Sequence, residues 1–161
     1  MKKIFNNAGE VKKTLSPDKT FTLISGSFDL LHIGHIHVLE YASTLEELLV
    51  VAVLSDDYIR KYKSLNRPII NEKQRAAMLA SLSCVDLVYI SDNEPNSPDN
   101  LGLLKPNSVV YSKEVANAEK VKLWTNKMKS CSPDTKIKLL PRYDKEEVST
   151  SNIIKKIRDI A

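Results

Sequence analysis

The three histidines of the chain, His32, His35 and His37, stand within six residues. The first two close the segment Gly26-Ser27-Phe28-Asp29-Leu30-Leu31-His32-Ile33-Gly34-His35, which follows a short apolar run and opens a helical pattern. Histidines three apart on a helix can point at one bound group. Imidazole N–H groups stabilise an anion as charge builds, and a helix N-terminus attracts phosphate. The spacing predicts a phosphate site with His32 and His35 as catalytic residues, and His37, which faces away, as structural.

The two glycines of this segment fit the same interpretation. Gly26 allows a tight turn out of the preceding strand, and Gly34 allows a ligand to approach the backbone at the start of the helix. The alternative is a structural zinc site, but no cysteine is near and the nearby acids are Asp29 and Glu40. We therefore predict no metal-ligating residues in the chain.

A second candidate region is basic and contains Lys63, Arg67 and Arg75. Taken alone, such a run is typical of a solvated surface loop. It follows the apolar run 48–54, however, and so lies at the carboxyl end of a predicted strand, beside the phosphate-binding turn. A basic loop in that place can clamp a triphosphate.

A third candidate is the hydroxyl cluster Ser149, Thr150 and Ser151, which precedes an amphipathic helical pattern over 151–160. Such clusters are ordinary helix N-caps, worth about 1 kcal/mol. They also create a second helix N-terminus that can hold the β- and γ-phosphates of a nucleotide.

The elements that must position these residues alternate between strand and helix. Apolar, β-branched runs predict strands, and helical periodicity predicts helices, over the following ranges: strands 21–25, 48–54, 85–90, 108–112 and 137–140; helices 34–45, 72–82, 114–128 and 151–160. This order predicts an α/β fold with a Rossmann-like, doubly wound, five-stranded parallel sheet and helices on both faces. Ligands of such sheets bind beyond the carboxyl ends of the strands. We expect one domain over 20–161, preceded by a tail or short helix over 1–19.

Composition and charge limit the classes of partner that the protein is expected to bind. The net charge of +4 is spread evenly along the chain, and the longest apolar run has seven residues, Leu48 to Leu54. These values argue against nucleic-acid binding and against a membrane-spanning segment. Two cysteines, Cys84 and Cys131, do not form a disulfide framework, so we expect a cytosolic protein.

The pattern Gly26-x-Phe28-Asp29-x-x-His32-x-Gly34-His35 resembles that of the cytidylyltransferase-like nucleotidyltransferases. The resemblance implies that His32 and His35 stabilise the α-phosphate of a nucleoside triphosphate, that Ser27 contacts phosphate, and that Asp29 helps to shape the site. It spans residues 21–160 and is thin over 92–135.

The middle and the end of the chain are similar to the ADP-heptose synthase branch of that family. The residues that match are Ser55-Asp56, Lys63, Arg67-Pro68, Gln74-Arg75 and Ser149-Thr150-Ser151. The match implies that Lys63 lies near the phosphates and that Arg75 is a phosphate-side or a structural residue. Pro141-Arg142 resembles the glycerol-3-phosphate cytidylyltransferase branch, in which the arginine meets phosphate. Residues 111–114 depart from the heptose pattern, which leaves the acceptor open.

The resemblance implies transfer of AMP or CMP from ATP or CTP to a phosphorylated sugar or polyol, with release of pyrophosphate. Mg²⁺ would accompany the triphosphate, and we expect a homodimer. Glycerol-3-phosphate cytidylyltransferase or FAD synthetase-like activity is the alternative within the enzyme class, and a non-catalytic nucleotide-binding regulatory module is the alternative outside it. His32-Ile33-Gly34-His35 also occurs in class I aminoacyl-tRNA synthetases, but the chain is too short for a tRNA-binding body.

Overall fold

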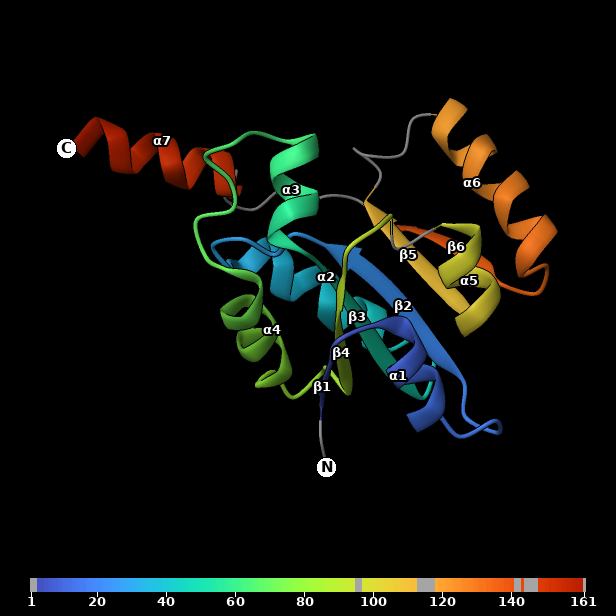
Figure 1. The fold of residues 1–161 in the computed structure, drawn as a ribbon. Helices are drawn as coiled ribbons and strands as arrows, with labels where there is room; N and C mark the ends of the chain where they lie inside the picture. The colour runs from blue at the N-terminus through green and yellow to red at the C-terminus, as the bar shows by residue number, and fades with distance from the viewer. Residues whose placement is uncertain (1–2, 95–96, 113–117, 141–142, 144–147, 161) are drawn as a thin grey trace.

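The computed structural model describes residues 3–94, 97–112, 118–140, 143 and 148–160 (Figure 1). Strands and helices alternate through this part of the chain. Its strands are β1 (Ile4–Phe5), β2 (Phe21–Gly26), β3 (Leu48–Leu54), β4 (Leu87–Ser91), β5 (Ser108–Ser112) and β6 (Lys136–Leu140). Its helices are α1 (Ala8–Thr14), α2 (Ile33–Ser43), α3 (Asp56–Tyr62), α4 (Glu72–Ala80), α5 (Pro98–Leu104), α6 (Ala118–Cys131) and α7 (Thr150–Ile160).

All strand pairs of the sheet are parallel, in the order β1-β4-β3-β2-β5-β6. The predicted α/β class and doubly wound parallel sheet are therefore confirmed. The sixth strand, β1, was not predicted, because two residues are too few to show an alternating pattern. It pairs with β4, and the helix that follows it, α1, buries Val11 completely. Residues 3–14 are thus part of the sheet and its core, where the sequence predicted only a tail or short helix.

Two helices, α3 and α5, form where the sequence predicted no helix, and their caps explain them. The Ser55 side chain accepts a hydrogen bond from the Tyr58 N–H at the start of α3, and two aspartates occupy the first turn. The Ser97 side chain caps α5 in the same way, and Pro98 occupies the first turn, where its missing N–H costs nothing. Capping by Ser55 and Ser97 therefore helps both helices to start.

Each face of the sheet is covered by helices. Side chains from α1, α5 and α6 pack on one face, and side chains from α2 and α4 pack on the other. Residues 49–53 of β3 are fully buried from both sides, as expected for a central parallel strand. No helix in the described ranges is long and apolar enough to cross a membrane.

The chain reverses its winding direction at β2. From β2 the connections run through β3 to β4, whereas β5 returns to the other side of β2 and leads on to β6. The crevice beyond the carboxyl ends of β2 and β5 is therefore the place where a doubly wound sheet binds its ligand. Figure 1 shows α3 beyond this edge of the sheet and α7 extending away from the body of the molecule. None of the described α7 side chains is buried.

Candidate active site

The turn after β2 is a compact loop that turns a phenylalanine inward. Phe28 and Leu30 both have left-handed backbone angles, with φ of 48° and 50°. Phe28 is nevertheless buried, and a Cβ at Gly26 would lie only 3.0 Å from its ring. Glycine at position 26 therefore makes room for the Phe28 ring, which supports the histidines that follow. No bound phosphate is needed to explain this glycine.

The two predicted catalytic histidines lie side by side at the start of α2. Their rings stack with centroids 3.8 Å apart and an interplanar angle of 21°, and the Phe28 ring meets the His35 ring edge-on at 5.4 Å. A Cβ at Gly34 would lie 3.1 Å from the His32 ring, so glycine at this position admits the stacked pair. The structure thus brings His32 and His35 to one place at the carboxyl end of β2.

His35 is neutral at pH 7. Burial, together with the charges of His32 and Lys63, lowers its pKa to about 4, and Asp29 opposes the shift. Its Nδ1 atom is buried and has no hydrogen-bond partner among the described residues. A proton there would be a buried donor without an acceptor, which is unfavourable. We therefore expect the proton on Nε2, where it can be donated to a bound group.

The lowered pKa of His35 predicts a pH dependence of stability. Below pH 6.5 the His35 side chain becomes protonated in the unfolded chain. In the folded chain it stays neutral down to about pH 4. The free energy of unfolding should therefore fall as pH decreases across this window. We expect a shallower fall in H35N, measured by urea denaturation between pH 6.5 and 4. H37N, which changes an exposed histidine of the same helix, should keep the wild-type slope; equal slopes in all three proteins would contradict the shift.

Asp29 positions the loop across the site. Its side chain is fully buried, with one carboxylate oxygen accepting from Arg67 Nε at 3.0 Å and from the Ile69 N–H at 2.9 Å. The other oxygen accepts from the Ile70 N–H at 3.0 Å. Both oxygens are thus engaged within the protein. This arrangement supports the implied role of shaping the site, and it explains Arg67, whose role the sequence left open.

The carboxyl-terminal hydroxyl cluster lies against the histidine segment, although the two are far apart in the chain. Thr150 Oγ1 donates to the Asp29 carbonyl at 2.8 Å, and the Val148 carbonyl lies 3.7 Å from where a Cβ on Gly34 would stand. Ser149 Oγ accepts from the Asn152 N–H at 3.1 Å and so caps α7. The N-termini of α2 and α7 therefore meet at one edge of the sheet, and both can attract phosphate.

Lys63 reaches the same place from the end of α3. Its Nζ donates to Ser27 Oγ at 3.0 Å, next to the turn that carries the histidines. Desolvation of the ammonium group and the charge of Arg67 lower its pKa, which Asp29 opposes. The structure thus brings together His32, His35, Lys63 and Ser27, which the sequence proposed from separate segments.

The contacts of Arg75 favour the structural one of the two roles that the sequence left open. It is fully buried and donates to the carbonyls of Leu54 and Ile70 at 2.8 Å each, to the Ser27 carbonyl, and to Asp56 Oδ1 at 2.7 Å. These bonds engage the guanidinium within the protein. Arg75 therefore ties the ends of β2 and β3 to the following loop, and holds Ser27 in place for Lys63.

Other predicted residues lie at the margin or outside the described chain. Ser151 lines a groove of about 450 Å³ between α7 and the loop 64–69, together with Arg67 and two basic residues of α7, Lys155 and Arg158. His37 packs against the Tyr143 ring at 5.1 Å, away from the stacked pair. Arg142 falls outside the described residues. Within the described ranges, no three His, Cys, Asp or Glu side chains cluster so that they could hold a metal ion.

Comparison with known proteins agrees with this geometry. The model of the cytidylyltransferase-like family matches residues 23–156. Bifunctional protein HldE of Helicobacter pylori (strain P12) is 37% identical over 147 residues, which are 91% of this chain and 29% of that protein. Bifunctional protein HldE of Campylobacter jejuni (strain RM1221) is 35% identical over 159 residues, 98% of this chain and 32% of that protein. The chain thus spans about three tenths of the length of these relatives.

Two solved structures share the fold of this chain. The lipopolysaccharide core biosynthesis protein from Thermoplasma volcanium GSS1 superposes with a TM-score of 0.68 at 27% identity, covering 78% of this chain and 99% of that one. Pantothenate synthetase from Thermus thermophilus has a TM-score of 0.67 at 12% identity, covers 99% of this chain and 71% of that one, and shows a shared fold alone. Because the family model covers most of the chain and includes both histidines, the chain belongs to the cytidylyltransferase-like family of nucleotidyltransferases.

Proposed function

We propose that the protein transfers AMP or CMP from ATP or CTP to a phosphorylated sugar or polyol and releases pyrophosphate, in the manner of a heptose-1-phosphate adenylyltransferase. One observation supports this most strongly. The stacked pair His32 and His35 meets the Lys63–Ser27 contact and the start of α7 beyond the end of β2. Donors and positive charge gathered at one point suit a triphosphate.

The chemistry needs little from the protein beyond position and charge. An oxygen of the acceptor phosphate attacks the α-phosphorus in line, the new P–O bond forms, and the bond to the bridging oxygen of the β-phosphate breaks. Pyrophosphate leaves with that oxygen. Because the acceptor phosphate is already ionised at neutral pH, no general base is required. Neutral His35 would donate from Nε2 to the α-phosphate as negative charge builds.

Mg²⁺ fits this site as a companion of the nucleotide. Both carboxylate oxygens of Asp29 are engaged by the 67–70 loop, so the ion would be held by triphosphate oxygens and water. When bound, it would neutralise charge on the triphosphate.

Lys63 is the side chain expected to neutralise the phosphates on the α3 side. Because a well-placed donor to developing charge contributes about 10²–10³ in rate, we expect K63A to lower kcat by about that factor. The measurement is pyrophosphate release at saturating substrate. K73A, which removes an exposed lysine of α4, is the matched control and should retain full activity. Unchanged turnover in K63A would show that Lys63 is not a catalytic residue.

The proposal is tested by assaying pyrophosphate release with four nucleoside triphosphates against heptose 1-phosphate, glycerol 3-phosphate, other polyol phosphates and FMN. We expect ATP or CTP to be used, with one phosphorylated sugar or polyol preferred. Nucleotide binding without pyrophosphate release in every combination would instead favour the non-catalytic module.

We also propose a homodimer in the cytosol. The support for dimerisation is α7, on which Ile157 and Ile160 are 56% and 86% exposed. Sedimentation equilibrium of the purified chain tests it, and a monomer at micromolar concentration would contradict it.

A further inference from the structure

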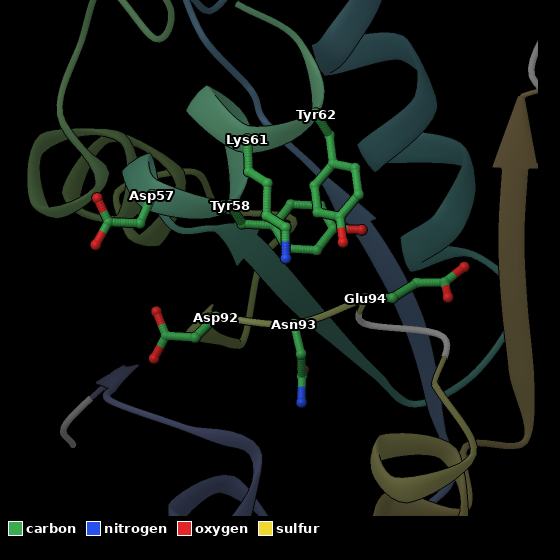
Figure 2. A pocket seen from close by; sticks show the side chains of 7 residues that line it. All are labelled: Asp57, Tyr58, Lys61, Tyr62, Asp92, Asn93 and Glu94. Atoms are coloured by element: carbon green, nitrogen blue, oxygen red, sulfur yellow. The ribbon is translucent and has the colours of Figure 1, made fainter. Parts of the chain in front are cut away.

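A second cavity of about 550 Å³ lies beside the phosphate site, between α3 and the segment that follows β4. Its lining consists of Asp57, Tyr58, Lys61, Tyr62, Asp92, Asn93 and Glu94. Figure 2 shows the side chains of α3 facing the 92–94 segment, with both tyrosine rings between them. None of these residues belongs to the phosphate site described above, and the proposed function assigns them no role.

The end of the segment 92–94 is held in place by partly buried hydrogen bonds. Asn100, which is 9% exposed, donates from Nδ2 to Asn93 Oδ1 at 2.8 Å and to the Glu94 carbonyl at 3.3 Å. Ser91 Oγ donates to the Asn93 carbonyl at 3.0 Å, and the Ser97 N–H donates to the Glu94 carbonyl at 2.8 Å. Residues 93 and 94 are therefore fixed before any ligand arrives, as expected of a binding site.

The charges of the cavity do not suit a phosphate. Asp57 pairs with Arg60 at 2.9 Å and Glu94 pairs with Lys127 of α6 at 3.4 Å, while Asp92 and Lys61 bring one further charge of each sign to the lining. The cavity therefore carries no excess of positive charge that would attract a second phosphate. Carboxylate oxygens accept hydrogen bonds, which makes them suitable partners for hydroxyl groups.

The aromatic side chains add an apolar wall. The rings of Tyr58 and Tyr62 lie 4.5 Å apart and are tilted by 37°. Such rings offer flat apolar surface with a polar hydroxyl at the end. Acceptor oxygens beside aromatic faces suit the alternating C–H and O–H groups of an uncharged polyhydroxylated molecule.

The cavity is continuous with the elements of the phosphate site. Leu54 and Ser91 are register partners at the ends of β3 and β4, so the segments that follow them leave the same edge of the sheet. Lys63, which donates to Ser27, directly follows Tyr62 of the cavity lining. In Figure 2, Asp57 and Asp92 lie on one side of the cavity and Glu94 on the other.

Glu94 also faces β5. Its charge adds to the burial that raises the pKa of Tyr58 on α3, and to the burial that raises the pKa of Tyr111 on β5. Tyr111 Oη is itself buried and has no hydrogen-bond partner in the described part of the chain. Glu94 follows β4, and the strands β3 and β2 lie between β4 and β5. A Glu94 side chain that faces β5 therefore also faces the end of β2, where the histidines lie.

We propose that this cavity binds the uncharged, polyhydroxylated part of the acceptor, while the acceptor phosphate lies at Lys63 and the histidines. The inference rests on the proposed function and deepens it, since it places the residues that select the acceptor on α3 and on 92–94. Asp92 and Glu94 would accept hydrogen bonds from acceptor hydroxyls, and the tyrosines would pack against the carbon skeleton.

The test compares D92A and E94A with wild type and with D134A, an exposed carboxylate before β6 at the opposite edge of the sheet. The probes are heptose 1-phosphate, sorbitol 6-phosphate and glycerol 3-phosphate. Because a hydrogen bond to a charged group is worth about one to two orders of magnitude in affinity, D92A and E94A should raise the KM of the preferred longer acceptor at least about tenfold. In both variants the KM of the triphosphate should stay within about twofold of the wild-type value. D134A should match wild type in the KM values of both substrates.

The preference among acceptors gives a second readout. Loss of hydroxyl partners should reduce the ratio of kcat/KM for the longer acceptor over glycerol 3-phosphate in D92A and E94A alone. An unchanged ratio with an unchanged acceptor KM would overturn the inference, and so would a rise in the triphosphate KM alone, which would assign the cavity to the nucleotide.

Calorimetry separates this inference from the proposed function. If wild type releases no pyrophosphate, the proposed function fails, and each probe is then titrated into protein saturated with a non-hydrolysable triphosphate analogue. Binding that weakens at least about tenfold in D92A and E94A but not in D134A would support the cavity as an acceptor site. Wild-type binding of none of the three probes would overturn it.

Discussion

H35A should release pyrophosphate at least about 10²–10³ times more slowly than wild type while keeping its fold. The neutral His35 ring has a buried Nδ1 with no hydrogen-bond partner among the described residues, so we expect its proton on Nε2. Removing the ring should take this donor away from the α-phosphate. The stacked partner His32 would also lose the ring that holds it at 3.8 Å. We expect H32A to behave in the same way. The measurements are steady-state pyrophosphate release and circular dichroism.

H37A is the matched control, because it removes the same side chain from the same helix two residues later. His37 is exposed and packs on Tyr143 rather than on the stacked pair, so its variant should turn over at the wild-type rate. Wild-type pyrophosphate release from H32A and H35A would refute the catalytic assignment. A comparable loss in H37A would mean that the effect comes from the helix and not from the site.

R75A should lower the free energy of unfolding by about 3–5 kcal/mol, because it removes one partner of a buried ion pair. The Asp56 carboxylate, with its side chain 16% exposed, would lose its partner at 2.7 Å. The carbonyls of Ser27, Leu54 and Ile70 would lose a donor as well. R75K should not rescue the variant, because an ammonium group cannot reproduce the planar fork. Urea denaturation at pH 7 measures the change.

R60A provides the comparison, since Arg60 also approaches Asp56, at 3.9 Å, and pairs with Asp57 at 2.9 Å. Both of these contacts lie at the surface, where ion pairs are worth at most about 1 kcal/mol. R60A should therefore unfold within about 1 kcal/mol of wild type. A loss below about 1 kcal/mol in R75A would show that the buried network contributes little.

Much of the fold could be predicted because its strands are read directly from apolar runs. The run Leu48 to Leu54 reappears unchanged as β3, and residues 108–112 reappear as β5. The placement of His32 beside His35 could be predicted because turn, glycines and helix start are consecutive in the chain. The strand β1 could not, because its position is fixed by pairing with β4, far along the chain, and not by its own pattern.

The different contacts of the three basic residues could not be predicted either. Lys63, Arg67 and Arg75 are all cations of one loop-and-helix stretch that can clamp a triphosphate, and the sequence leaves the roles of Arg67 and Arg75 open. Packing separates them: Arg75 is buried beneath the turn, Arg67 meets Asp29, and Lys63 reaches Ser27 at the surface. Such a choice depends on where the 64–70 loop folds back, which only the tertiary structure determines.

The two sides of α3 differ in a way that bears on how this protein can evolve. Ile59 on one side is buried, and the chain then continues into Lys63 beside the anchored turn. The opposite side, with Asp57, Lys61 and Tyr62, is exposed and lines the cavity. Substitutions on that exposed side remove few buried contacts, so they cost little stability. If this cavity selects the acceptor as proposed, point mutations on this side of α3 would change the acceptor, while the Arg75 network would hold the turn after β2 in place.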